Sequence, residues 1–221
     1  MKKGLIFDMD GTLLDSMSAW HTLASRTVRS FGKTPEADLD QKINQMSVAE
    51  GCRYLTGTYD LALSEKEMYS SILGTMQRFY ESEVEVKPGI RAFLEECKKS
   101  GVPMCVATAT DRPLTLAALR HTKLFSFFDA VFTVAEVGAE KDRADIYEAA
   151  ADRMQLAKEQ CIVFEDACYA AMTAKQAGFI VVGIEDDTEA DQKGLRKICD
   201  HYVEKGKEAE QLMLLKKKER L

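Results

Sequence analysis

Short apolar runs alternate with helical patterns along this chain from Pro88 onward. The runs have the length of strands, and with one further run near the N-terminus they cover residues 5–7, 102–107, 130–134, 161–164 and 179–184. The segments between them repeat apolar positions at helical spacing, over residues 88–100, 114–124, 144–156 and 167–177. Strands that alternate with helices predict a parallel sheet covered on both faces. We therefore expect an α/β fold.

The stretch from residue 16 to about residue 83 has a different pattern, with no convincing strand. Apolar positions at helical spacing predict three helices there, over residues 20–31, 48–55 and 68–79. This organisation indicates a core formed by residues 1–15 and 84–221, with residues 16–83 inserted as a helical bundle. At the C-terminus, Leu212, Leu214 and Leu215 lie among many charges, which is typical of a docked or frayed terminal helix, with a partner-binding amphipathic helix as the alternative.

The composition is that of a soluble globular protein, with 46% apolar and 30% charged residues in 221. A net charge of −6 creates no field that attracts nucleic acid or an anionic membrane, so neither is expected as a partner. No apolar run approaches the ~20 residues of a membrane span, and the run after Met1-Lys2-Lys3 is too short for a signal peptide. The six cysteines form no CxxC pair, which favours reduced thiols. We expect a cytoplasmic protein that is a monomer or a weak homodimer.

Two aspartates follow the first apolar run, in the stretch Leu5-Ile6-Phe7-Asp8-Met9-Asp10-Gly11-Thr12. If the run is a buried strand, these residues lie at its carboxyl end, where open α/β sheets bind their ligands. Alternation along the strand points Asp8 and Asp10 the same way. Gly11 permits a sharp turn, and Thr12 offers a hydroxyl and a backbone N–H. The two like charges repel unless a metal ion, a cation or a shared proton offsets them.

Polar residues also follow two later strands. Thr108 ends the second strand, the pair Glu165-Asp166 ends the fourth, and Lys141 precedes the helix that leads to that strand. Each is also typical of a structural role alone: a turn cap, a helix N-terminus and a surface charge, respectively. Together they supply hard oxygen ligands without His or Cys, which fit Mg²⁺. Mg²⁺ beside a lysine and backbone N–H groups is suited to a phosphoryl group.

The run Asp8-Met9-Asp10-Gly11-Thr12, continued by Leu13-Leu14-Asp15-Ser16, resembles the opening motif of the haloacid dehalogenase-like hydrolase superfamily. Thr108, Lys141 and Glu165-Asp166 match its next three motifs in order and approximate spacing. Residues 163–167 and 174–178 are similar to the branch that includes phosphoglycolate phosphatase and β-phosphoglucomutase. The resemblance implies a three-layer, Rossmann-like α/β core with a parallel sheet and an inserted α-helical cap domain. It also implies an enzyme, a phosphatase of a small phosphomonoester such as a sugar phosphate, a nucleotide or an organic phosphate.

The resemblance assigns the catalytic roles as well. Asp8 would be the nucleophile and would form an aspartyl-phosphate. Asp10 would protonate the leaving alkoxide and then deprotonate the water that hydrolyses the intermediate. Thr108 and Lys141 would bind and neutralise the phosphoryl oxygens.

The ligand sets follow from the same resemblance. Mg²⁺ would be held by Asp8, Glu165, Asp166 and the backbone carbonyl of Asp10. The phosphoryl group would contact the positions Thr12, Thr108, Ala109 and Lys141. Ala109 stands where relatives often have Asn, so it offers no side-chain donor.

The lysine loop departs from the family pattern. Lys141 is followed by Asp142, and then by Ala144, at two positions where relatives usually have Pro. Proline fixes the backbone angle φ, so its absence predicts a looser loop around an unchanged lysine charge.

Other activities on this fold stay open. A sugar phosphomutase, the main alternative, needs a second anion site, and residues 44–48 of the expected cap contain no basic residue, although Lys42 and Arg53 lie nearby. Dehalogenase relatives lack the second aspartate, so Asp10 argues against that activity. Phosphonate-cleaving relatives use a cap lysine; Lys42 is a candidate for that role, but no adjacent signal supports it.

A non-catalytic function is also considered. Receiver domains combine acidic residues, a hydroxyl and a lysine around Mg²⁺, but they are shorter and place the phospho-acceptor on a later strand. The spacing of Asp8 and Asp10 and the long helical insertion both argue against that class. A binding protein without catalysis is the third possibility, and the full set of motif residues argues against it.

Overall fold

The computed structural model describes residues 3–221, so Met1 and Lys2 of the expected N-terminal segment lie outside the described residues. The chain divides into two compact units, one containing the residues up to Ser16 together with Val84–Leu221, and the other Met17–Glu83. We call the first the core unit and the second the helical unit. The function of the helical unit as a cap stays a prediction.

The core unit is built on a six-stranded sheet with the order β5-β4-β1-β6-β7-β8. All its neighbouring strands pair in parallel. The strands are β1 (Gly4–Phe7), β4 (Met104–Thr108), β5 (Ala130–Thr133), β6 (Cys161–Glu165), β7 (Ile180–Ile184) and β8 (His201–Val203). The chain moves outward from β1 through β4 and β5, and then outward on the other side of β1 through β6 to β8. This reversal beside β1 is the point at which such sheets open a ligand crevice.

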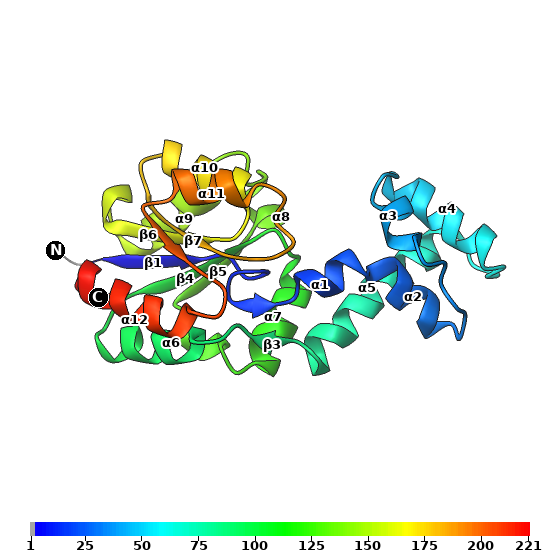
Figure 1. Cartoon of the computed structure of the whole chain (residues 1–221), viewed down its shortest axis with the longest axis horizontal. Coiled ribbons are helices and arrows are strands. Elements are labelled where there is room, and N and C mark those ends of the chain that lie inside the picture. The colour runs from blue at the N-terminus through cyan, green and yellow to red at the C-terminus, as the bar shows by residue number, and fades with distance from the viewer. Residues whose placement is uncertain (1–2) are drawn as a thin grey trace. The chain divides into compact units, whose positions relative to one another are not determined.

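Helices cover both faces of this sheet (Figure 1). In Figure 1, α9 and α10 lie on one side of the strands, and α6 and α12 on the other. The helices of the core unit are α6 (Ile90–Lys99), α7 (Arg112–His121), α8 (Val134–Val137), α9 (Asp145–Met154), α10 (Cys168–Gln176), α11 (Gln192–Ile198) and α12 (Glu208–Glu219). The predicted three-layer α/β fold is confirmed.

Alternating side chains of the two central strands build the core on both faces. Ile6 and Val163 belong to the apolar cluster that includes the buried faces of α9 and α10. Their neighbours Phe7 and Phe164 stack at 4.4 Å between ring centroids, and Phe93 of α6 packs 5.7 Å from the Phe164 ring. Because successive strand residues face opposite ways, β1 and β6 pack against apolar side chains on both faces of the sheet. Acidic residues stand at the carboxyl ends of these two strands.

A short antiparallel ribbon connects the two units along the chain. It pairs β2 (Leu14–Asp15), just before the helical unit, with β3 (Glu85–Val86), just after it. Such short strands carry too few apolar positions to be detected from sequence. The predicted elements likewise omitted β8 and α11, which are short and half polar.

The helical unit consists of α1 (Met17–His21), α2 (Leu23–Ser30), α3 (Leu39–Ile43), α4 (Val48–Thr58) and α5 (Glu65–Ser82). Capping boxes start α4 at Ser47 and α5 at Ser64. The expected helix over 20–31 is instead two helices broken at Thr22, whose hydroxyl donates to the Ser18 carbonyl at 2.7 Å. A hydroxyl that bonds to the backbone competes with the helical pattern, which hydropathy alone does not reveal.

Two other expectations are confirmed. All six cysteines are free thiols. The C-terminal segment forms the docked helix α12, with Leu212 and Leu215 buried and Leu214 exposed. Among the described residues, none of the helices combines the length and apolar character needed to cross a bilayer.

Gly89 provides a test of the packing between α6 and α12. Its φ is +77°, and a Cβ there would lie 2.5 Å from the Cα of Ala209 in α12. Gly101 has a similar φ of +71°, but a Cβ on Gly101 would meet no other atom within 4 Å. We expect Gly101→Ala to lose about 1 kcal/mol of unfolding free energy from the left-handed backbone alone. Gly89→Ala should lose about 3 kcal/mol or more, because it adds a backbone clash. Equal losses in urea denaturation would contradict this account.

Candidate active site

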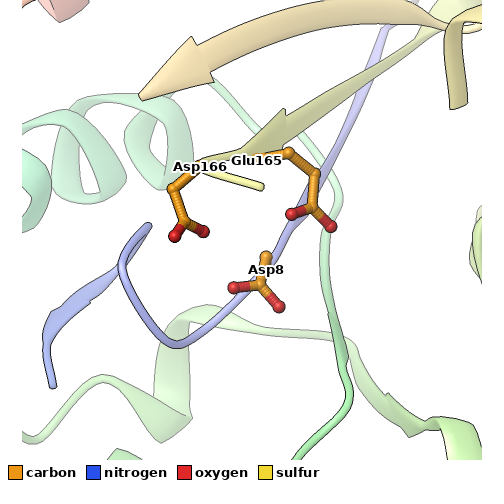
Figure 2. Close-up of side chains that lie close together, drawn as sticks. All are labelled: Asp8, Glu165 and Asp166. Carbon is orange, nitrogen blue, oxygen red and sulfur yellow. The ribbon is translucent and has the colours of Figure 1, made fainter. Parts of the chain in front are cut away.

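Three buried carboxylates meet where β1 and β6 end. Asp8 follows β1, Glu165 is the last residue of β6, and Asp166 comes directly after it. The backbone N–H of Asp8 donates to the Phe164 carbonyl at 3.0 Å, which extends the pairing of the two strands as far as the site. Figure 2 shows the three carboxyl groups turned toward a common space. One oxygen of each lies within 4.8 Å of the others.

Lys141 offsets part of this negative charge. Its side chain is 3% exposed, and its ammonium donates to Asp8 Oδ1 and, at 2.6 Å, to Glu165 Oε1. Burial alone would lower the pKa of Lys141, but the carboxylates of Asp8 and Glu165 outweigh burial and raise that pKa. The lysine therefore stays an ammonium at neutral pH.

The lysine loop has Asp142 and Ala144 at the two positions where the family pattern has proline. Lys141 is buried, and the turn after it is closed by a hydrogen bond of 3.1 Å from the Arg143 N–H to the Glu140 carbonyl. Ala144 then starts α9 with a φ of −79°, close to the angle that proline would impose. Ion pairing of Lys141 thus fixes the end of its side chain on the interior side, and the looser loop expected from the sequence stays a prediction.

The positive charge of Lys141 does not fully offset the negative charge of the three carboxylates. Burial raises the pKa of Asp8 well above its usual range, and the charges of Glu165 and Asp166 raise it further against the effect of Lys141. Burial and the charge of Glu165 raise the pKa of Asp166 to about 7. A divalent cation would relieve this repulsion, and carboxylate oxygens are the ligands that hard cations select. Asp8, Glu165 and Asp166 therefore form a candidate metal site.

Both carboxylate oxygens of Asp10 have hydroxyl partners. One carboxylate oxygen accepts a hydrogen bond of 2.6 Å from the Ser16 hydroxyl, and the other accepts one of 2.7 Å from the Thr110 hydroxyl. The three-carboxylate group identified among residues 3–221 does not include Asp10. A metal contact through its backbone carbonyl, as expected from the sequence, stays a prediction.

The positions expected to bind phosphate have separate surroundings. Thr12 donates its hydroxyl proton to Asp166 Oδ1 at 3.1 Å, so its side chain orients a carboxylate. The Thr108 hydroxyl accepts the Thr110 N–H at 3.1 Å and keeps its own proton for donation. Ala109, which lies between Thr108 and Thr110 in the sequence, is exposed, and its backbone N–H is the polar donor that it can offer. Phosphate contacts of these residues stay predictions.

Tyr147, on α9, is a site residue that the sequence pattern did not reveal. Its hydroxyl donates to Glu165 Oε1 at 2.7 Å, the same oxygen that accepts from Lys141. Burial and the nearby charge of Glu165 raise the pKa of Tyr147, so the phenol keeps its proton and acts as a donor. Tyrosine within an apolar helical pattern is typical of a core residue, so its spacing gave no sign of this contact.

The Tyr147 hydroxyl should therefore stabilise the buried carboxylate. We expect Tyr147→Phe to fold and to lose about 2 kcal/mol of unfolding free energy, as for a hydrogen bond to a charged group. Tyr202→Phe is the matched control, because the Tyr202 hydroxyl donates at 2.6 Å to the neutral Gln192 side chain. The control should lose about 1 kcal/mol or less. Urea denaturation of both variants measures the difference, and a smaller loss for Tyr147→Phe than for the control would argue against this role.

Comparisons with known proteins agree with this geometry. Residues 2–178 match the family model of haloacid dehalogenase-like hydrolases. A phosphorylated carbohydrates phosphatase of Thermotoga maritima is 28% identical over 176 residues, which cover 80% of this chain and 82% of the relative. Hexitol phosphatase A of Escherichia coli is 27% identical over 183 residues and covers 82% of each chain.

Solved structures show the same likeness. A crystal structure named "putative beta-phosphoglucomutase", from Thermotoga maritima, superposes with a TM-score of 0.84 at 26% identity and covers 98% of this chain and 99% of its own. The family and the enzyme class predicted from the sequence are confirmed. This chain is a member of the haloacid dehalogenase-like hydrolase family.

Proposed function

We propose that this hydrolase is a Mg²⁺-dependent phosphatase that cleaves a small phosphomonoester through an aspartyl-phosphate on Asp8. The observation that carries the proposal is that one buried aspartate pairs with a buried ammonium while two further carboxylates have oxygens within 4.8 Å of its own. A purely structural ion pair needs one carboxylate for each cation. Here three carboxylates lie beside the Lys141 ammonium, and such an excess of carboxylates is the arrangement that a metal-dependent site requires.

Asp8 is placed to act as the nucleophile. It follows β1 directly, so the strand and its two neighbours hold its backbone rigidly. Lys141 bonds to its Oδ1 and favours its ionised form, which is the form that attacks. A bond forms between the Asp8 oxygen and phosphorus while the bond from phosphorus to the alkoxide breaks.

Lys141 and the carboxylates would prepare the phosphoryl group. Asp8, Glu165 and Asp166 would hold Mg²⁺, with the backbone carbonyl of Asp10 as the further ligand that the family resemblance suggests. Bound Mg²⁺ supplies positive charge that lowers the repulsion between an anionic nucleophile and an anionic phosphate. Lys141 contributes a fixed positive charge to the same end.

Asp10 is the proposed acid and base. In its protonated form it gives its proton to the leaving alkoxide, and as a carboxylate it then takes a proton from the water that attacks the aspartyl-phosphate. The hydroxyls of Ser16 and Thr110 fix both of its oxygens. Thr108 and the backbone of Ala109 and Thr12 are the proposed contacts of the phosphoryl oxygens.

The substrate class proposed is a phosphorylated sugar or a similar small ester. Relatives named for phosphorylated carbohydrates and hexitols support this choice. A mutase requires a free cationic group for a second phosphate. Within the helical unit, Lys42 pairs with Glu36 at 2.7 Å and Arg53 pairs with Glu65 at 3.0 Å, which favours hydrolysis over phosphoryl transfer between two sugar positions.

Lys42 is also a poor candidate for the Schiff base of a phosphonate-cleaving enzyme. Hydrogen bonds to Glu36 and Asp38 raise the pKa of Lys42, whereas a lysine nucleophile needs a lowered pKa. The cytoplasmic location and the monomeric or weakly dimeric state stay predictions from the sequence.

The function is tested by assaying the purified protein against a panel of small phosphomonoesters with Mg²⁺. We expect steady release of phosphate that a chelator abolishes and added Mg²⁺ restores. Failure to release phosphate from every member of the panel would overturn the proposal. A glucose phosphate that is isomerised without phosphate release would identify a mutase.

Replacement of the nucleophile should abolish turnover. We expect Asp8→Asn to lower kcat by about 10⁴-fold or more while the protein stays folded, because Lys141 keeps Glu165 as its partner. Asp152→Asn, at an exposed position of α9, is the matched control and should keep full activity. Phosphate release and thermal melting check both variants, and substantial activity in Asp8→Asn would exclude Asp8 as the nucleophile.

Asp10 should show its two roles separately with two kinds of substrate. For an alkyl phosphate, Asp10→Asn should slow turnover by about 10²- to 10⁴-fold, since the alkoxide needs a proton. An aryl phosphate has a leaving group that departs without a proton. It should therefore give a rapid burst of one equivalent of phenolate, followed by slow hydrolysis of the aspartyl-phosphate. Wild-type steady-state rates with both substrates would contradict the assignment of Asp10.

A further inference from the structure

Lys87 is a buried cation that the proposed chemistry does not use. It is the first residue after β3, where the chain has returned from the helical unit. Its side chain is 7% exposed. The ammonium donates to the Gly11 carbonyl at 2.5 Å, to the Glu185 carbonyl at 3.0 Å and to Asp186 Oδ2 at 2.8 Å. All three of its donor protons therefore have oxygen acceptors.

Asp186, just beyond β7, completes the ion pair. Its other oxygen, Oδ1, accepts hydrogen bonds from the Thr188 N–H at 3.1 Å and from the Thr188 hydroxyl at 2.7 Å. Burial alone would raise the pKa of Asp186, but the hydrogen bonds from Lys87 and Thr188 hold it below its usual range. Asp186 therefore stays a carboxylate, and both of its oxygens are held in place by hydrogen bonds.

Stability is a weak explanation for such a pair. Removing two charges from water costs about as much as their attraction returns, so an apolar pair of similar volume is often equally stable. The contacts point instead to the backbone turn that Lys87 holds. Its ammonium binds the Gly11 carbonyl, and its own N–H donates to the Leu13 carbonyl at 3.0 Å. Lys87 thus binds the turn after β1 at two carbonyl groups, those of Gly11 and Leu13.

This turn carries site residues on both sides of Gly11. Asp10 precedes Gly11, and Thr12 follows it and bonds to Asp166 through its hydroxyl. Gly11 has a φ of +77°, so the turn depends on a conformation that few residues adopt. Because a peptide group is planar, fixing the Gly11 carbonyl also fixes the plane from which Thr12 starts.

The position of the pair in the sheet supports the same conclusion. In the strand order, β6 lies between β1 and β7. Lys87 connects the segments that follow β1 and β7, so its contacts span the end of β6. Glu165 ends β6 and Asp166 follows it. The pair therefore connects the segments after β1 and β7, which lie on either side of the carboxylates Glu165 and Asp166.

We propose that Lys87 and Asp186 form a buried clamp that positions the turn of Asp10, Gly11 and Thr12 against Asp166. Both are positioning residues, because each acts through the backbone turn and neither contacts the reacting atoms. The inference rests on the proposed function for its effect on catalysis. Its effects on the turn and on metal binding can be measured without turnover.

The main test uses the double variant Lys87→Met/Asp186→Asn, which removes both charges and leaves neither one buried alone. We expect its melting temperature to stay near that of the wild type. Hydrogen exchange of residues 9–14 should become faster, and Mg²⁺ affinity measured by calorimetry should fall by about 10- to 100-fold. With an active substrate, kcat should fall by a similar factor.

Lys205→Met is the matched control. Lys205 pairs with Asp187, next to Asp186, but this pair is exposed and does not contact the turn. The control should keep wild-type exchange in residues 9–14 and wild-type Mg²⁺ affinity. Asp186→Asn alone is the second variant, which keeps the ammonium and its two carbonyl contacts and should loosen the same turn to a smaller extent.

The outcomes separate the clamp from the function. Wild-type exchange and Mg²⁺ affinity in the folded double variant would overturn the clamp, even if the enzyme is a phosphatase. If the double variant does not fold, the same wild-type result for Asp186→Asn overturns it. A wild-type protein without phosphatase activity would remove the proposed function, while faster exchange and weaker Mg²⁺ binding in the variants would still support the clamp.

Discussion

Repulsion among three buried carboxylates is the constraint on which the rest of this site depends. Asp8, Glu165 and Asp166 are each less than a tenth exposed, and their oxygens converge on one space. The ammonium of Lys141, which pairs with Asp8 and Glu165, offsets part of the charge. A polypeptide holds like charges together only when surrounding structure leaves them no alternative. The stacked Phe7 and Phe164 in the strands that end at the site, and the parallel pairing of these strands, provide that rigidity.

Much of the fold and the main cluster could be predicted from the sequence. Parallel strands bring their carboxyl ends to one edge of a sheet, so Asp8 and Glu165-Asp166 could be placed at the same edge. That their two strands are neighbours is seen only in the structure. Lys141 was identified through the family resemblance. Its contacts could not be derived from spacing, because its loop joins the site through tertiary structure. The confirmed fold shows that apolar periodicity is a reliable signal for long, buried elements.

The supporting residues could not be predicted for a physical reason. Tyr147 lies in an apolar helical pattern, where a tyrosine normally indicates packing, and only the structure shows its hydroxyl on Glu165. Lys87 follows a two-residue strand and resembles a surface charge in sequence. Its acceptors lie 76 and 99 positions away, at Gly11 and Asp186. Contacts of such long range leave no periodic trace in the sequence.

The partners of the two motif aspartates differ in a way that suits different chemistry. Asp8 bonds to an ammonium, which only donates hydrogen bonds and so opposes the rise in the pKa of Asp8 that burial causes. Asp10 bonds to the hydroxyls of Ser16 and Thr110, which can accept as well as donate. A hydroxyl can change from donor to acceptor whereas an ammonium cannot, so the hydroxyl partners of Asp10 are the more adaptable ones. Residues two positions apart on one turn thus have different partners, because their neighbours come from different strands and loops, and this difference supports the separate roles proposed for them.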